Sequence, residues 1–218
     1  MQQRRTSLLI PLATAAGLAF IAGVMLVATQ ANSDPVGRHY DAYNRVLTGD
    51  LILLLVCSVW IAREIKHRSL AGTTATRAIA GGFGLMVAGN VVEFWGALVT
   101  GSETEKTAAR LGHEDAFWGS GVGWILFLLG SVVATVALII VARAAGRWGA
   151  TSSQRWAIGA AGVMQAAASA LWAAAPIAAA IPAAAFAFGW LSLATAVQRA
   201  DEHATTQVGS SAATTARA

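Results

Sequence analysis

Apolar residues in this chain form long continuous blocks that are separated by short polar segments. The first four blocks lie near residues 8–28, 46–62, 78–99 and 119–141, and a fifth covers residues 156–197. Within a block the apolar residues do not alternate with polar ones at the period of a strand or of an amphipathic helix. A helix needs roughly 20 apolar residues to cross about 30 Å of hydrocarbon. The pattern therefore predicts an all-α, polytopic integral membrane helix bundle.

The fifth block is too long for one span. A single helix over residues 156–197 would extend for about 63 Å at 1.5 Å per residue, roughly twice the thickness of the hydrocarbon. Pro176 lies near its middle, and proline disfavours a continuing helix because it lacks the backbone N–H. We therefore expect two spans, near 156–174 and 176–197, joined by a tight turn, which brings the total to about six transmembrane helices. Pro182 is expected to kink the last span.

Basic residues between the blocks predict the orientation of the bundle. Cytoplasmic loops of membrane proteins are enriched in lysine and arginine. If both chain ends are cytoplasmic, only four of the 15 basic residues lie outside, namely Arg38, Arg45, Lys106 and Arg110. The inside residues are Arg4, Arg5, Arg63, Lys66, Arg68, Arg77, Arg143, Arg147, Arg155, Arg199 and Arg217. This distribution favours an N-in/C-in topology.

The chain ends flank a single transmembrane domain over residues 8–197. Residues 1–7 form a basic N-terminus that we expect in the cytoplasm. Residues 1–31 have the outline of a signal peptide, but their apolar run exceeds the 7–15 residues usual for such peptides. We interpret the segment as a retained anchor, and its cleavage would leave the remaining topology unchanged. Residues 198–218 are small and polar, so we expect a disordered cytoplasmic tail.

The composition agrees with a membrane location and argues against other classes. The 218 residues are 56% hydrophobic and 12% charged, whereas about 25% charged residues is usual in soluble proteins. The net charge of +4 arises from clusters between the blocks. No basic stripe with interleaved aromatic residues is present, so no nucleic-acid partner is expected. Arginine outnumbers lysine 13 to 2 and alanine is abundant, a bias of GC-rich genomes that favours a bacterial inner membrane.

Polar residues within the predicted spans are the candidate binding site. A carboxylate in the middle of a membrane helix costs about 2.5–3.5 kcal/mol, so such residues suggest a function. We predict an outward-facing polar pocket for a small solute or ion. Its residues are Asp50, Asn90, Glu93, Gln165 and Ser169. A structural explanation stays open, in which Asp50 pairs with Arg45 near the headgroups and Glu93 hydrogen-bonds to Asn90 or to another helix.

The outer loops contain weaker candidates for a metal site. His39, His113, Glu114 and Asp115 are residue types that bind zinc or other divalent ions. Their spacing matches no established site, and the preferred explanation is that they are solvated loop residues. No lysine and no histidine falls within a predicted span, and Cys57 is the sole cysteine. We therefore expect no cofactor, no Schiff base and no intramolecular disulfide.

Three functions stay open for such a bundle. The leading hypothesis is a small membrane protein that binds or transports a solute or ion through the outward-facing pocket. The first alternative is a structural or accessory subunit, which would dock helices of a partner subunit or of further copies of this chain. Small-residue faces at Ala80-Gly84-Ala88 and Gly162-Ala166-Ala170 would serve such docking. The second alternative is a membrane-embedded enzyme using the outer acidic and histidine residues, although familiar catalytic motifs are missing.

Overall fold

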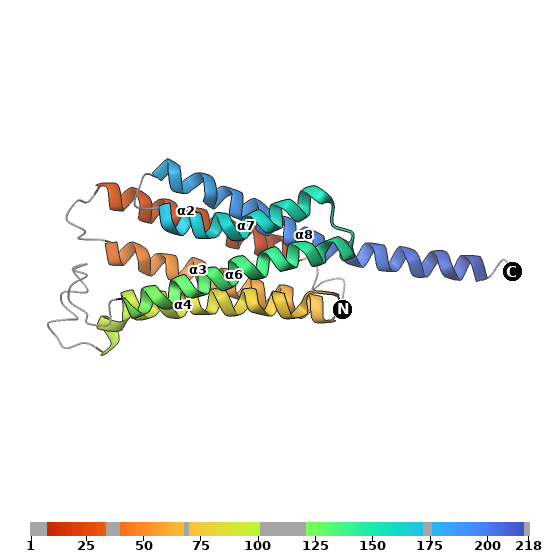
Figure 1. The fold of residues 1–218 in the computed structure, drawn as a ribbon, viewed down its shortest axis with the longest axis horizontal. Helices are drawn as coiled ribbons and strands as arrows, with labels where there is room; N and C mark the ends of the chain where they lie inside the picture. Colours follow the sequence, from red (N-terminus) through yellow and green to blue (C-terminus); the bar gives the residue numbers. More distant parts are fainter. Residues whose placement is uncertain (1–7, 34–39, 68–69, 101–120, 172–175, 216–218) are drawn as a thin grey trace.

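The chain folds into a bundle of long helices (Figure 1). The computed structural model describes residues 8–33, 40–67, 70–100, 121–171 and 176–215. In these ranges the structure has α2 (Leu9–Ser33), α3 (Tyr40–His67), α4 (Thr73–Thr100), α6 (Val122–Ala145), the short 3-10 helix η2 (Gly146–Trp148), α7 (Ser152–Leu171) and α8 (Pro176–Thr215). These elements are all helical, which confirms the all-α part of the predicted fold class.

Five of the six long helices are apolar enough to cross a membrane. Their apolar segments are Leu9–Thr29, Asn44–His67, Thr73–Trp95, Val122–Trp148 and Ile177–Ala200. The exception is α7, whose 20 residues still reach about 30 Å. Its hydropathy is lowered by Gln154 and Arg155 near its start and by Gln165 in its middle. Gln165 is fully buried, so this polar residue faces other helices and not the surroundings of the bundle.

The helices form a closed ring. Each long helix packs against its neighbours in the described sequence, and α8 packs against α2, which joins the last helix to the first. Successive helices run in opposite directions (Figure 1). The helix ends at the right of Figure 1 carry a set of exposed basic residues, and we call this the basic end. Its residues are Arg63, Lys66, Arg77, Arg143, Arg147, Arg155 and Arg199.

Four aromatic rings fill the middle of the ring of helices. Phe20, Phe83, Phe186 and Trp190 are all essentially inaccessible. The Phe20 and Phe186 rings lie 4.7 Å apart in an edge-to-face arrangement, and the Phe83 ring meets Trp190 at 5.7 Å in the same way. Edge-to-face geometry is favoured because the positive edge of one ring meets the negative face of the other. This cluster joins α2, α4 and α8.

Proline marks the break in the fifth apolar block. As predicted, the block is divided: α7 ends at Leu171 and α8 begins with Pro176. Proline suits the first position of a helix because its missing N–H would have no partner there. Pro182 lies inside α8, which continues through it to Thr215. The helix thus extends well past the bundle (Figure 1), through a segment whose composition led us to expect disorder.

Glycine allows α4 and α6 to approach each other closely. A Cβ at Gly82 would lie 2.7 Å from the backbone nitrogen of Ala134 and 2.7 Å from the carbonyl oxygen of Gly130. The small-residue face Ala80-Gly84-Ala88 does not use Gly84 in this contact, because a Cβ at Gly84 would meet only the end of the Leu55 side chain at 4.0 Å. The predicted face on α7 does include a close contact, since a Cβ at Gly162 would lie 2.8 Å from the Thr135 carbonyl oxygen.

Candidate functional site

Asn90 joins α4 to α3 through a small polar network. Its amide nitrogen donates hydrogen bonds to the carbonyl oxygen of Asn44 at 2.7 Å and to the hydroxyl of Thr48 at 2.8 Å. The Thr48 hydroxyl also accepts a bond from the indole nitrogen of Trp95 at 3.1 Å. Asn44, Thr48 and Asn90 are all buried. Both bonds of Asn90 use its nitrogen, so its amide oxygen remains available as an acceptor.

A small cavity, which we call the central cavity, lies beside this network among the helices, toward the end of the bundle opposite the basic end. It has a volume of about 20 Å³ and is lined by residues of α2, α3, α4, α6 and α7. Asn44, Asn90 and Ser169 supply its polar lining, and Val24, Val27, Leu47, Trp124, Phe127 and Ala168 supply the apolar lining. A water molecule needs roughly 10–15 Å³ of such volume. The cavity therefore has room for about one water-sized species.

Gln165 lies one turn from Ser169 on α7 and connects three helices. Its amide nitrogen approaches the Ser169 hydroxyl at 3.4 Å and the sulfur of Met86 at 3.6 Å. Its amide oxygen accepts a bond from Ser131 of α6 at 3.3 Å. These contacts turn the polar groups of α7 inward. They also link Gln165 to the cavity indirectly, because Ser169 belongs to the cavity lining.

Glu93 faces the beginning of α6. Its carboxylate accepts a hydrogen bond from the backbone N–H of Gly121, the residue before α6, at 3.3 Å. A carboxylate is favourable there because unpaired N–H groups give the start of a helix a partial positive charge. Gly123 makes room for the side chain, since a Cβ at this position would lie 2.7 Å from the Glu93 oxygen.

Asp50 faces α2. One of its carboxylate oxygens is buried and has no hydrogen-bond partner among the described residues. The same oxygen lies where a Cβ of Gly23 would be. The buried oxygen does not pair with Arg45, whose side chain donates to the carbonyl oxygen of Phe94 at 2.6 Å. Asp50 also lies well inside α3, which begins at Tyr40, so it does not cap the start of this helix.

The five predicted residues thus occupy three places. Asn90 and Ser169 line the central cavity and Gln165 adjoins it, whereas Glu93 lies between α4 and α6 and Asp50 between α3 and α2. Sequence reasoning missed Asn44 and Thr48, which contact Asn90 directly. Their separation by four residues places them on one helix face, and this spacing at the edge of the second block was the available signal.

The weaker metal candidates His39, His113, Glu114 and Asp115 lie outside the described residues. The enzyme hypothesis requires His39, His113 or Glu114 to lie near Glu93, and it therefore stays a prediction. Within the described segments no group of three or more histidine, cysteine or acidic residues is arranged to hold a metal ion.

The long apolar helices and the way they pack define the class of this protein: it is a membrane-type helical bundle. Comparison with protein-family models, with curated proteins and with solved structures gives no match.

Proposed function

We propose that the chain is a six-span protein of a bacterial inner membrane, with both ends cytoplasmic, that binds a small solute or ion in the outer half of the bundle. The observation that carries this proposal is the cavity lined by Asn90, Ser169 and the Asn44 residue to which Asn90 is bonded.

The arrangement of α7 supports six spans. Polar residues lower its hydropathy, yet Gln165 is fully buried against Ser131 and Met86. Its exposed positions include Val163 and Leu171, which suit contact with lipid. The positive-inside rule supports the orientation, because the exposed basic residues of the described segments gather at one end of the bundle.

The size and chemistry of the cavity restrict its occupant. Neutral oxygens of Asn90 and Ser169 are hard ligands that suit a monovalent cation, an ammonium ion or water. A volume of about 20 Å³ excludes a sugar or an amino acid from the cavity in this conformation. Toward the basic end, the Phe83 and Trp190 rings occupy the middle of the bundle. A transport function would therefore require these rings to move, whereas binding alone would not.

Thermal stability of the purified full-length chain tests the binding proposal. Sodium, potassium and ammonium chloride are compared at constant ionic strength, with choline chloride as the reference. We expect at least one small cation to raise the melting temperature, and Ser169→Ala to abolish that rise. Ser192→Ala is the matched control, because both serines donate to the carbonyl four residues earlier, at 3.0 and 2.9 Å, but Ser192 does not line the cavity.

A uniform response to all the salts in the wild-type chain would refute ion binding at this site. Equal loss of the response in Ser169→Ala and Ser192→Ala would refute the assignment to the cavity.

A second candidate function is that of an accessory subunit. The observation in its favour is the helical extension of α8, which continues to Thr215 beyond the bundle (Figure 1). A helix that leaves the bundle in this way offers a surface to another protein. Chemical cross-linking in native membranes should then give one partner in fixed ratio, and deletion after residue 200 should remove that product while the bundle stays folded.

A further inference from the structure

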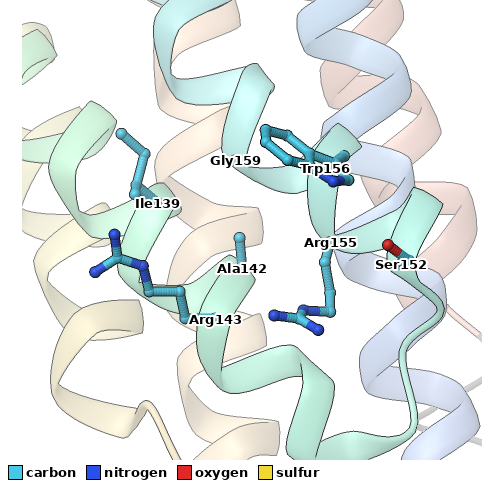
Figure 2. Close-up of a pocket in the computed structure, with 7 residues that line it drawn as sticks. All are labelled: Ile139, Ala142, Arg143, Ser152, Arg155, Trp156 and Gly159. Atoms are coloured by element: carbon cyan, nitrogen blue, oxygen red, sulfur yellow. The ribbon is translucent and has the colours of Figure 1, made fainter.

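We propose that a second cavity, at the basic end of the bundle, binds the headgroup of an anionic phospholipid. This cavity lies between α6 and α7 and has a volume of about 320 Å³ (Figure 2). Arg143 and Ile139 line it from α6, and Ser152, Arg155, Trp156 and Gly159 line it from α7. It is distinct from the central cavity, since the two share no lining residue.

Two guanidinium groups stand on opposite walls of the cavity. In Figure 2 the Arg155 side chain extends from α7 toward the end of α6, whereas the Arg143 side chain runs from α6 toward the level of Ile139. Both side chains are exposed, and neither has a hydrogen bond or ion pair to any residue that the structure describes. Two positive charges that line one cavity without a counterion among the described residues attract an anion. Guanidinium groups match phosphate oxygens well because their N–H donors have a planar, paired geometry.

The fold holds Arg155 in this position. Its side chain lies over Gly146, where a Cβ would be 3.3 Å from its Cζ and Nε atoms. The start of α7 is fixed by a reciprocal pair of bonds: the Thr151 hydroxyl accepts from the Gln154 N–H at 3.3 Å, and the Gln154 side chain accepts from the Thr151 N–H at 3.0 Å. Such a capping box fixes the first turn of a helix. Ser152, the first residue of α7, adds a hydroxyl to the cavity lining.

The walls of the cavity change from polar to apolar along the bundle. Ile139 precedes Arg143 by one turn, and Gly159 follows Arg155 by one turn. On both walls the apolar residue therefore lies about 6 Å further from the basic end. A free phosphate ion would use only the arginines, whereas a phospholipid would place its phosphate at the polar end of the cavity and its glycerol and acyl chains against the apolar part.

Trp156 supplies independent support for a lipid. Its side chain is 78% exposed although it is large and largely apolar. An exposed tryptophan beside arginines is typical of the membrane–water interface, where the ring lies at the level of the headgroups. If the basic end is cytoplasmic, this interface belongs to the more negatively charged leaflet. The inference depends on the proposed orientation for the choice of leaflet and is independent of ion binding in the central cavity.

Quenching of Trp156 fluorescence by brominated lipids tests the inference. The full-length chain is reconstituted in phosphatidylcholine vesicles that contain brominated acyl chains on either phosphatidylglycerol or phosphatidylcholine. The contribution of Trp156 is obtained by subtraction of the signal of Trp156→Phe. We expect phosphatidylglycerol to quench Trp156 preferentially. Replacement of Arg143 or Arg155 by glutamine should reduce this preference by roughly fivefold each, because one basic residue near the surface contributes about that factor.

A matched pair of substitutions separates a site from general charge attraction. Arg63→Gln with Arg77→Gln removes two exposed arginines from the same end, neither of which lines the cavity. This control should retain the preference that Arg143→Gln with Arg155→Gln loses. Far-ultraviolet circular dichroism checks that both double variants are folded. If one of them does not fold, its two single variants are compared in its place.

Three results would overturn the inference. The first is equal quenching of wild-type Trp156 by both lipids, and the second is an equal loss of preference in the two double variants. The third is loss of the preference on addition of inorganic phosphate, which would identify free phosphate as the occupant in place of a lipid headgroup.

Discussion

Gly89 of α4 and Gly123 of α6 lie so close that a Cβ on either residue would collide with the carbonyl oxygen of the other. The same reciprocal relationship holds for Gly82 and Gly130, one heptad away on each helix. The two pairs bring the helix backbones together over about two turns. In a membrane, where the hydrophobic effect does not drive helix association, such close backbone contact is a main source of packing energy.

Substitution of these glycines should destabilise the bundle. A Cβ at Gly89 would also lie 2.6 Å from the backbone nitrogen of Phe127, and backbone atoms move aside less easily than side chains. We expect Gly89→Ala and Gly82→Ala each to lower the free energy of unfolding by about 1–3 kcal/mol, measured by denaturation in mixed micelles. Gly81→Ala is the control, because a Cβ there meets nothing within 4 Å, and it should stabilise by up to about 1 kcal/mol. A loss of stability in Gly81→Ala equal to that in Gly82→Ala would contradict the explanation.

The bond between Asn90 and Thr48 should appear as an energetic coupling. We expect a double-mutant cycle of Asn90→Ala and Thr48→Val to give roughly 0.6 kcal/mol, and no more than about 1.7 kcal/mol, as for other polar contacts between membrane helices. The same cycle of Asn90→Ala with Thr29→Val should give a coupling near zero, since the Thr29 hydroxyl bonds within its own helix, to Met25. Equal coupling in the two cycles would show that the bond at 2.8 Å adds nothing specific.

Asp50 should reduce the stability of the bundle. Because one buried carboxylate oxygen has no partner among the described residues, Asp50→Leu is expected to raise the free energy of unfolding by about 1–3 kcal/mol. Gly23→Ala should have the opposite effect, because its Cβ would collide with that oxygen. The effect of Gly23→Ala should shrink when Asp50 is replaced by alanine, which removes the colliding group. If Gly23→Ala is equally harmful in both backgrounds, the contact between α2 and α3 has another basis.

The capping box at the start of α7 should contribute measurably to stability. Thr151→Ala removes the acceptor for the Gln154 N–H, and loss of such a cap costs typically about 1 kcal/mol. Thr74→Ala provides a comparison at an exposed position near the start of α4, where the change should stay within about 0.5 kcal/mol. Thermal unfolding of the two variants in the same detergent measures the difference. Indistinguishable melting temperatures would argue that the cap does not limit the stability of the bundle.

The sequence predicted the helices better than their lateral contacts. Length and hydropathy were sufficient for five apolar helices, and Pro176 was sufficient for the division between α7 and α8. Each predicted span was shorter than its helix, since hydropathy marks only the apolar part; α3, for example, begins at Tyr40 and ends at His67.

The grouping of the polar residues could not be predicted in the same way. Asp50 and Glu93 were both predicted to line one pocket, yet one faces α2 and the other faces the start of α6. Depth follows from position along a helix, but direction depends on how each helix is rotated against its neighbours. That rotation is set by close contacts such as Gly82 with Gly130, whose partners are far apart in the sequence. Gly84 lies outside the contact between α4 and α6, because small residues occur on more than one side of α4.

The closed ring of helices has a consequence for synthesis. α2 is the first described helix to emerge from the ribosome, but one of its two neighbours is α8, the last. Until Pro176 and the residues after it are made, Phe20 lacks its edge-to-face contact with Phe186, and one side of the growing bundle has no helix against it. A chain that terminates before α8 would therefore expose the faces of α2 and α7 that α8 covers in the finished protein.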